Sequence, residues 1–420
     1  MSEDKLVPSI RFKGFEEEWK TDKLGKVTKY VKGFAFKSKD YTNTGIRIVR
    51  VTDLTENKID ELKKDSTFVS LKTAESYQKY RIYKGDIIIT TVGSKTELKS
   101  SSVGRAIFVS KSVNYLLNQN LVKLSTINKI NSPFVYFLLC KPNYSNYISR
   151  IERGNANQAN IAIDDLWKYK FKIPQFSEQQ KIGDLFAKLD RLLDLQQQKL
   201  DQLELLKKAL LQKLFPKQDE KIPELRFKGF EDEWKTNALQ EISKIVGGGT
   251  PDTNKADYWN GDINWYSPTE IGKKPFAYSS NKKISKIGLK KSSAKLLPAN
   301  KTVLFTSRAG IGDMAILKTP AATNQGFQSL ELKDNVYPYF VYSYGFEIKR
   351  KAKKLASGST FLEISNKDMK RITLEFPNVK EQQKIGNLLA KIDRLIELEN
   401  KKFSNLKLVK KSLLQNMFVE

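Results

Sequence analysis

Two stretches of the chain repeat apolar residues every seven positions. One position of the repeat holds Ile182, Leu189, Leu203 and Leu210 in the first stretch, and Ile385, Ile392, Leu406 and Leu413 in the second. The other holds Leu185, Leu192 and Leu206, flanked by Phe186, Leu193 and Leu200, and in the second stretch Leu388, Leu395 and Val409. This spacing predicts two long helices that share a coiled-coil-like seam.

Local signals predict where these helices begin and end. Ser177 with Gln180 forms a capping box at the start of the first helix, and Asn378 with Glu381 offers the same device in the second. Pro216 ends the first helix, which gives it a length of about 55 Å at about 1.5 Å per residue.

Polar residues interrupt each seam at the same place, Gln196 with Lys199 in the first helix and Glu399 with Lys402 in the second. Packing the helices together would align these breaks in either orientation, and a polar layer fixes register in many coiled coils. We favour an antiparallel pair, because a two-fold axis then places the globular parts of the two copies at opposite ends. The alternative is that these side chains simply reach solvent.

Short runs rich in β-branched residues lie outside the helices. "GDIIITTV" (85–92) and "KTVLFTS" (301–307) are flanked by turn residues, which is typical of buried strands. "NSPFVYFLLC" (131–140) favours a helix instead. The regions at about 21–175 and 237–376 are therefore predicted to be α+β domains.

The chain also repeats itself. "PSIRFKGFEEEWKT" (8–21) returns as "PELRFKGFEDEWKT" (223–236), and "EQQKIGDLFAKLDRLLDL" (178–195) returns as "EQQKIGNLLAKIDRLIEL" (381–398). A period of about 200 residues fits two whole domains better than a solenoid. We therefore expect an α+β protein with two globular domains in tandem pseudo-two-fold repeat, joined by two long antiparallel coiled-coil helices. The expected segments are 1–175, 176–216, 217–376 and 377–420, in the order domain, helix, domain, helix.

Composition narrows the range of functions. Lys and Arg number 74 against 47 Asp and Glu, a net charge of +27 that suits a polyanion such as nucleic acid, although a lysine-rich surface without that role is the alternative. The chain has no histidine, so acid–base and histidine-ligated metal chemistry lose their commonest participant. A single cysteine, Cys140, excludes a disulfide framework. No apolar run is long enough to span a bilayer and the start lacks a signal-peptide pattern, so we expect a cytoplasmic location.

Motifs for catalysis are missing. The sequence contains neither the cofactor loop and Asn/Asp-Pro-Pro-aromatic segment of a base methyltransferase nor a GxxxxGK[ST] phosphate loop, and "VGGGTP" (246–251) is interpreted as a flexible loop. Asp86 with Glu97 and Lys99 could form a nuclease site, but Glu-x-Lys recurs throughout this chain. The aromatic residues of the two boxes could stack on bases, but we favour a role in anchoring each domain to its helix.

Residues that differ between the two domains are the better candidates for reading DNA. Loops specific to one domain offer Lys, Arg, Ser, Thr and Asn side chains that can bind phosphates and base edges. The candidates are Lys95, Thr96, Lys99, Ser100, Arg105 and Arg153 in the first domain, and Thr250, Asn254, Lys255, Ser307, Arg308 and Ser359 in the second. Asn118-Gln119 and Asn324-Gln325 recur at matching places, and this repetition favours stabilisation of a turn over base contact.

The whole layout resembles the specificity subunit of type I restriction–modification systems. The resemblance rests on "IPQFSEQQKI" (173–182) and "FPNVKEQQKI" (376–385), on "GGGTPDTNKADYWNGDINWYSPTEI" (247–271), and on "SRAGIGDMAIL" followed by "ATNQGF" (307–327). It implies two target-recognition domains that each read half of a split site in double-stranded DNA, and helices that separate them and dock two modification subunits. It also implies that S-adenosylmethionine binds the modification subunit, and that ATP and Mg²⁺ serve a restriction subunit that translocates and cleaves DNA. The first half has "VKGFAFKSKDY" (31–41) in place of the GGxTP string.

We therefore expect a non-catalytic DNA-binding subunit whose asymmetric target has both halves within about 12–16 base pairs, at about 3.4 Å per base pair. Two other classes stay open. A stand-alone nuclease would cut DNA when incubated with Mg²⁺, and an adaptor for acidic proteins would show no salt-dependent DNA binding.

Overall fold

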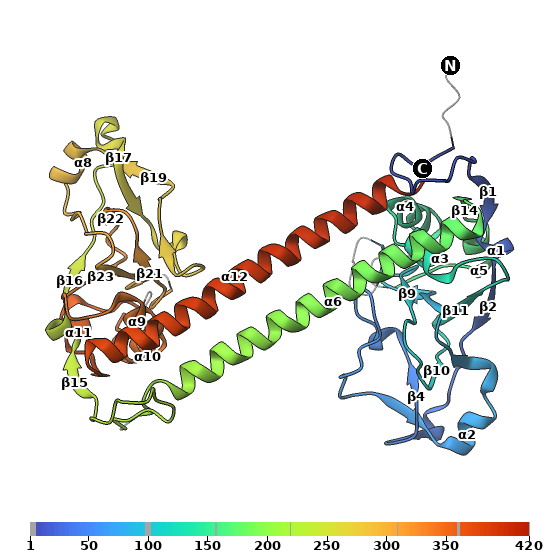
Figure 1. Ribbon diagram of the computed structural model, residues 1–420, viewed down its shortest axis with the longest axis horizontal. Coiled ribbons are helices and arrows are strands. Elements are labelled where there is room, and N and C mark those ends of the chain that lie inside the picture. Colours follow the sequence, from blue (N-terminus) through green and yellow to red (C-terminus); the bar gives the residue numbers. More distant parts are fainter. Residues whose placement is uncertain are drawn as a thin grey trace. The chain divides into compact units, whose positions relative to one another are not determined.

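The computed structural model describes residues 6–96, 102–155, 158–218, 220–308, 310–358 and 362–419. The chain divides into unit 1, made of Met1–Gln197 and Lys402–Glu420, and unit 2, Gln198–Lys401. Each unit holds one α+β domain and part of each of two 38-residue helices, α6 (Phe176–Lys213) and α12 (Val379–Asn416) (Figure 1). The unit boundaries differ from the expected segment ends because both long helices pass from one unit into the other.

The same central sheet recurs in both units. In unit 1 its strand order is β2 (Thr28–Lys32), β11 (Leu121–Thr126), β7 (Ile87–Thr90) and β9 (Ala106–Phe108). In unit 2 it is β16 (Ser243–Gly247), β23 (Gln328–Leu332), β20 (Thr302–Phe305), β21 (Met314–Leu317) and β18 (Phe276–Ala277). The two predicted strands are β7 and β20, which confirms both. Every residue of these two strands is buried, as expected for a strand covered on both faces.

Matching helices and a matching two-stranded sheet complete the repeat. Their bounds in unit 1 are α1 (Leu24–Val27), α3 (Ser132–Leu139), α4 (Pro142–Ile151), α5 (Ile163–Trp167), and β14 (Lys170–Ile173) paired with β1 (Lys20–Lys23). In unit 2 they are α7 (Leu239–Ile242), α9 (Pro338–Ser343), α10 (Gly345–Leu355), α11 (Asn366–Arg371), and β24 (Thr373–Phe376) paired with β15 (Lys235–Ala238). The helix predicted at 131–140 is α3, which Asn131 caps by accepting a hydrogen bond from the Phe134 N–H at 2.9 Å.

A second sheet differs between the units. In unit 1 it contains β3 (Tyr41–Thr42), β5 (Thr67–Val69), β4 (Ile46–Val49), β10 (Tyr115–Leu117) and β6 (Arg81–Ile82), with α2 (Leu71–Glu75) nearby in sequence. In unit 2 it contains β19 (Lys282–Ile284), β17 (Trp259–Tyr266) and β22 (Ala321–Thr323), and α8 (Lys286–Lys290) follows β19 in the sequence. Three strands correspond in order and direction, β5-β4-β10 in unit 1 and β19-β17-β22 in unit 2, and unit 1 adds β3 and β6 at the two edges.

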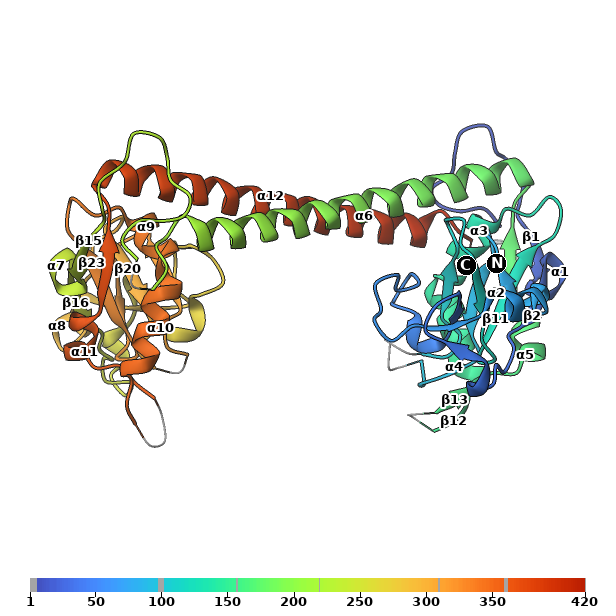
Figure 2. The same ribbon diagram turned by 90° about the horizontal axis from the view of Figure 1, so that it is seen from below.

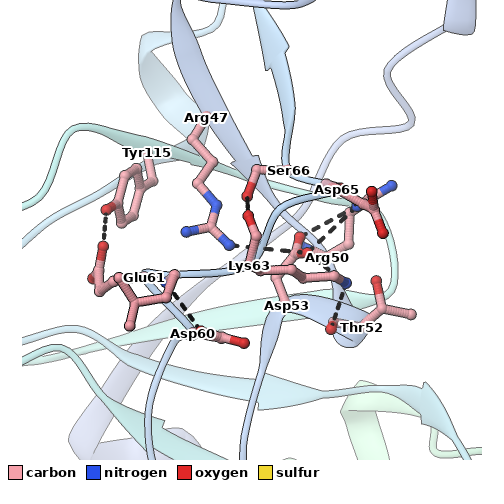
Figure 3. A network of polar contacts seen from close by, with 11 residues as sticks. Arg47, Arg50, Thr52, Asp53, Asp60, Glu61, Lys63, Asp65, Ser66 and Tyr115 are labelled. Carbon is pink, nitrogen blue, oxygen red and sulfur yellow. Dashed lines mark hydrogen bonds and ion pairs between the residues drawn. The ribbon is translucent and has the colours of Figure 1, made fainter. Parts of the chain in front are cut away.

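A buried carboxylate organises the segment between β4 and β5 in unit 1. Asp53 is fully buried and lies 2.9 Å from Lys63 Nζ, 3.3 Å from Arg50 Nε and 3.9 Å from Arg47 Nη2 (Figure 3). Burial alone would raise the pKa of Asp53, but hydrogen bonds from Arg50 and Lys63 outweigh it and hold this pKa below the usual 3.8. Unit 2 has a related turn after β17, where the Ser267 N–H donates to Glu270 Oε2 at 2.8 Å as the Arg50 N–H donates to Asp53 Oδ2 at 2.8 Å.

The long helices pack antiparallel in both units. In unit 1, Lys410 of α12 pairs with Asp190 of α6. In unit 2, Lys207 Nζ of α6 lies 2.5 Å from Asp393 Oδ1 of α12, and Lys199 pairs with Glu399. Residue numbers thus rise along one helix as they fall along the other, which confirms the antiparallel prediction. The Lys199–Glu399 pair also shows that the two polar breaks meet.

One of the two predicted seam positions is wrong by one residue. Ile182 and Ile385 are buried as expected, whereas Leu192 and Leu206 are about half exposed, as are Leu395 and Val409 at the matching places of α12. The buried positions are those of the flanking residues, such as Phe186 and Leu200. Leucine stands at both neighbouring positions of the repeat, so only the partner helix decides which one faces inward.

The predicted caps of the long helices have different outcomes. Asn378 Oδ1 accepts a hydrogen bond from the Glu381 N–H at 3.0 Å, as expected. Ser177 lies inside α6, and the carbonyl of Gln175 accepts from Glu178 and Gln179 instead, so the cap predicted at Ser177 is wrong.

Candidate nucleic-acid interface

The duplicated box and the duplicated helix start form one joint, which is present in each unit. In unit 1, Nε and Nη2 of Arg11 donate to the two carboxylate oxygens of Glu178, each at 2.8 Å. In unit 2, Arg226 donates to Glu381 in the same way, at 2.8 and 2.9 Å. Both glutamate side chains are fully buried. The repeated sequence is therefore structural: it ties each domain to the first turn of its long helix.

Aromatic packing completes this joint. Trp19 packs edge-on against Phe418, just after α12, and Trp234 packs in the same way against Phe215, just after α6, each pair with ring centroids 6.2 Å apart. Both indoles are 1% exposed, so these rings cannot stack on bases. The anchoring role predicted for the boxes is confirmed.

The glutamine after each of these glutamates joins the long helix to the domain. Gln179 Nε2 donates to the Pro174 carbonyl at 2.9 Å, while its Oε1 accepts from the Asn131 N–H at 3.0 Å. Gln382 makes the equivalent bonds to Pro377 and Tyr337, both at 2.9 Å. The two halves therefore share a frame, meaning the contacts that join each domain to its long helix. Any difference in what the halves bind must come from the loops that they do not share.

In unit 1, three of these loop segments meet at a small sheet. Its strands are β8 (Val92–Gly93), β13 (Ala159–Asn160) and β12 (Arg153–Gly154), with Gly93 opposite Ala159 and Arg153 opposite Asn160. Figure 2 shows β12 and β13 at the opposite extremity of unit 1 from the first turns of α6. The loop after β8 carries the candidates Lys95 and Thr96, so the fold brings them together with Arg153.

The candidates in unit 1 have different surroundings. Arg153 is 66% exposed and donates to Asp165 at 2.7 Å, which aims its guanidinium along the surface. Arg105 immediately precedes β9, and partial burial lowers the pKa of its guanidinium below its usual value. Lys95 and Thr96 are half-buried. Lys99 and Ser100 lie outside the described residues.

In unit 2, the loops after β16, β20 and β22 meet in the corresponding way. The exposed Thr250 donates its hydroxyl hydrogen to Gln325 Oε1. The Ser307 N–H donates to the Gly326 carbonyl at 2.8 Å, and Arg308 follows directly with 36% of its side chain exposed. Thr250, Ser307 and Arg308 are thus brought together, around the turn that holds Gln325.

One candidate in unit 2 is buried. Ser307 is 0% exposed, and its backbone pairs with Gly326 and Ile364, so it supports the loop and cannot itself reach a bound duplex in this conformation. Its prediction as a direct contact is corrected on this ground. Asn254 and Lys255 are exposed in the loop between β16 and β17. Ser359 lies outside the described residues.

The repeated Asn-Gln pairs lie at tight turns. Asn324 Oδ1 accepts from the Gly326 N–H at 2.8 Å, which confirms its predicted role in stabilising a turn. Gly248 packs against this turn so closely that a Cβ would lie 1.8 Å from the Asn324 carbonyl oxygen, and Gly33 approaches Asn118 in the same way, at 1.9 Å. Glycine at 248 is therefore required by close backbone approach.

Three polar residues at these loops were not among the sequence candidates: Glu152, Gln325 and Glu363. Gln325 was singled out for its repetition and assigned to the turn, yet its side chain is exposed beside Thr250. The two glutamates carry no local signal, because Glu is common in this chain and their partners are distant in sequence.

Within the described ranges, no group of three or more Cys, Asp and Glu side chains could hold a metal ion. In the same part of the chain, no helix is both long and apolar enough to cross a membrane.

Comparison with protein families shows to which family the chain belongs. The sequence model of the type I restriction modification DNA specificity domain matches residues 16–205 and again 231–408. The chain belongs to this family. The specificity domain occurs twice, and its two copies coincide with the two halves of the sequence repeat.

Curated relatives include specificity subunits from two organisms. The MjaIX specificity subunit of Methanocaldococcus jannaschii is 35% identical over 193 residues, which cover 45% of this chain and 44% of the relative. The EcoR124I/EcoR124II specificity subunit of Escherichia coli is 38% identical over 180 residues, 41% and 43% of the two chains. The chain thus matches less than half the length of these two relatives. The putative MjaX specificity subunit is 23% identical over 95% of this chain and 92% of its own.

A solved structure shares the fold of this specificity-family chain. The crystal structure of the type I restriction–modification S subunit from M. genitalium aligns with a TM-score of 0.63 over 99% of both chains, at 17% identity. The α+β fold with two tandem domains and two long helices is therefore the fold expected from the sequence.

Proposed function

We propose that this chain is a sequence-specific DNA-binding subunit of a type I restriction–modification complex, in which each domain reads one half of a bipartite, asymmetric target. The main support for the proposal is that the family's specificity domain occurs twice in the chain. The two copies share the joint to the long helices and differ in their loops. A net charge of +27 supports a polyanionic ligand. Because the loops differ, the two half-sites are expected to differ in sequence.

The proposed DNA-contacting residues are the sequence candidates other than the buried Ser307. In unit 1 they are Lys95, Thr96, Arg105 and Arg153, with Lys99 and Ser100 from the adjacent loop. In unit 2 they are Thr250, Asn254, Lys255 and Arg308, with Ser359. Arg and Lys can pair with guanine or hold phosphate, and Ser and Thr position the backbone.

Methylome sequencing of cells with and without the gene tests this function. A bipartite methylated motif that disappears with the gene is the expected result. Salt titrations of the purified protein on that motif should show affinity that falls steeply with ionic strength. Loss of the gene without any change in methylation, together with salt-independent DNA binding, would contradict the proposal.

The helices are proposed to set the distance between the half-sites. A 38-residue helix is about 57 Å long at about 1.5 Å per residue. Inserting residues into α6 alone would shift Lys199 out of register with Glu399. One heptad should therefore be inserted into both helices, after Gln197 and after Lys401, which adds about 10 Å or about 3 base pairs. An unchanged spacer in an active variant would count against this role.

Modification subunits are proposed to dock on the same helices. Leu192 and Leu195 of α6 are 49% and 51% exposed, and Leu395 and Leu398 of α12 are 47% and 45% exposed. Each pair lies on one helix face, three residues apart, and each unit presents one pair. Repetition of the same exposed apolar pair fits two copies of one partner.

Charged substitutions test this docking. Leu192→Lys with Leu195→Lys should remove one modification subunit, and Leu395→Lys with Leu398→Lys the other, as measured by native mass spectrometry of the purified complex. Leu71→Lys is a matched control, because Leu71 is 66% exposed on α2. Full retention of both subunits in both double variants would refute this surface.

Methylation and cleavage are proposed to belong to partner subunits, with S-adenosylmethionine bound by the modification subunit and ATP and Mg²⁺ used by the restriction subunit. The sequence supports this assignment through its missing cofactor and phosphate-loop motifs. Incubating the pure chain with target DNA, Mg²⁺ and S-adenosylmethionine should yield neither cut nor methylated product.

A further inference from the structure

A glutamate braces the candidate loop of unit 1. Glu152 stands between α4 and β12, where its backbone N–H is fixed by the Ile148 carbonyl at 2.9 Å. Its Oε2 accepts two hydrogen bonds from Thr96, one from the backbone N–H at 3.0 Å and one from the hydroxyl at 2.5 Å. One carboxylate oxygen thus holds the loop that carries Lys95 against the hairpin that carries Arg153.

A glutamate also contacts the candidate loop of unit 2. Glu363 exchanges backbone hydrogen bonds with Ser357 at 3.1 and 3.0 Å, in the segment between α10 and α11. Its Oε1 lies 3.5 Å from Ser307 Oγ, and its Oε2 lies 4.0 Å from Arg308 Nη1. The carboxylate therefore faces the loop after β20, as Glu152 faces the loop after β8.

The two braces arise from different positions in the repeat. Glu152 directly precedes β12, the first strand of its hairpin, whereas Glu363 follows Ser357 and pairs with it from the opposite side of its turn. They belong to the divergent parts of the two halves, so they are not a remnant of the shared frame. Each domain has thus placed a carboxylate against its own loop.

A negative charge at this place is unfavourable for a surface that binds phosphates. A carboxylate repels a DNA backbone, and nothing in the joint to the long helices requires one here. A carboxylate is therefore expected here only if it orients the hydrogen-bond donors around it. Here it orients the amide and hydroxyl of Thr96 in unit 1 and lies against the guanidinium of Arg308 in unit 2, and both residues are proposed DNA contacts.

We propose that Glu152 and Glu363 are positioning residues for sequence readout, each fixing the recognition loop of its own domain and acting on its own half-site only. The inference rests on the proposed function and extends it to two residues that contact the loop. It predicts a division of labour: a substitution at one glutamate leaves recognition by the other domain intact.

Methylome sequencing of cells that carry single variants tests the division. Glu152→Ala and Glu363→Ala should each raise methylation of near-cognate sites about 5–20-fold relative to cognate sites, the range expected when a hydrogen-bonded base reader loses its orientation. The near-cognate sites must carry their mismatch in one half for Glu152→Ala and in the other half for Glu363→Ala. Each variant is therefore the matched control of the other.

Conservative variants separate positioning from a general folding role. Glu152→Gln keeps an acceptor oxygen for Thr96 but loses the charge that strengthens both hydrogen bonds, so it should relax the half-site less than Glu152→Ala does. Glu152→Asp keeps the charge, shortens the reach and should relax the same half-site as Glu152→Ala. The Asp variant also serves if the Ala variant does not fold.

Three results would overturn the inference. They are relaxation of both half-sites by one variant, unchanged specificity in both Ala variants, and a Gln variant that exchanges one preferred base for another, which would make the glutamate a direct reader of cytosine. Failure of the proposed function is distinguishable, because wild-type cells would then show no bipartite motif at all.

Discussion

Replacing Arg226 with alanine removes the only basic partner that the structure shows for the fully buried carboxylate of Glu381 among the described residues. The guanidinium donates two hydrogen bonds to that carboxylate and a third, at 2.7 Å, to the Asp232 carbonyl inside the box. Its hydrogen bond to Glu381 raises the pKa of Arg226 above its usual value, so the guanidinium stays charged. The variant therefore leaves a buried charge uncompensated.

The expected loss follows from this burial. The side chains of Arg226 and Glu381 are 12% and 0% exposed, so solvent screens the pair little. Removing one partner of such a pair costs about 3–5 kcal/mol. For a folding unit of about 200 residues, at about 2–4 °C per kcal/mol, the melting temperature of unit 2 should fall by about 6–20 °C.

Hydrogen exchange with scanning calorimetry measures where the loss occurs. Arg226→Ala should lose protection around the second box and the first turns of α12, while the first box keeps its protection. Arg11→Ala is the matched variant, because Arg11 holds Glu178 with the same geometry in unit 1. It should produce the mirror-image pattern.

A double variant tests the cause. Arg226→Leu with Glu381→Leu removes both charges and should recover most of the stability, because a buried ion pair is no more favourable than an apolar pair of similar volume. A loss below about 1 kcal/mol in Arg226→Ala, or a double variant no better than the single one, would refute the reasoning about an uncompensated charge.

Three further substitutions test other parts of the frame. Gly386→Ala would stabilise an ordinary helix by about 1 kcal/mol, but here the new Cβ would lie 2.6 Å from the Tyr337 ring, so urea unfolding should show a loss of about 1–3 kcal/mol, and any gain would contradict this packing. The pKa of Asp53 in the folded state lies below its unfolded value of 3.8, so its contribution to the free energy of unfolding is complete above that pH and is lost as the pH falls through the folded pKa. Acid unfolding of Asp53→Asn, followed by circular dichroism, should therefore depend less on pH below about 4. An unchanged profile would exclude the carboxylate as the titrating group. Lys199→Glu should destabilise the helix pair by only about 0.5–1 kcal/mol because Lys199 is 54% exposed, and Lys199→Glu with Glu399→Lys should restore it in thermal melts unless the polar layer serves another purpose.

Sequence alone predicted the features that depend on repetition and periodicity. The two copies of RFKGF and EQQKI marked a joint that occurs twice, and the seven-residue repeat located both long helices to within a few residues. The repeat of domain and helix favoured an antiparallel pair through a two-fold axis, which the Lys410–Asp190 and Lys207–Asp393 pairs confirm. Sequence reveals these features because a helical period and a repeated set of residues are both visible in the order of residues along the chain.

The candidate interface was less predictable. Residue type selected Lys95, Thr96, Arg153 and Arg308 as accessible polar groups, but it also selected Ser307, which is buried. Burial of a serine depends on neighbours such as Gly326 and Ile364, which are near in space and far in sequence. No local pattern records that neighbourhood.

Tertiary structure alone decided the inward face of the long helices and the partners of the isolated charges. Leu192 and Leu193 are equally apolar, and the position of the second helix determined which side of α6 would be covered. Glu152 and Glu363 acquire a role only when chain folding brings a hairpin against a loop more than fifty residues away in sequence. Sequence therefore determined the repeating frame, because short-range periodicity encodes it. The fold determined the loop contacts, because long-range packing creates them.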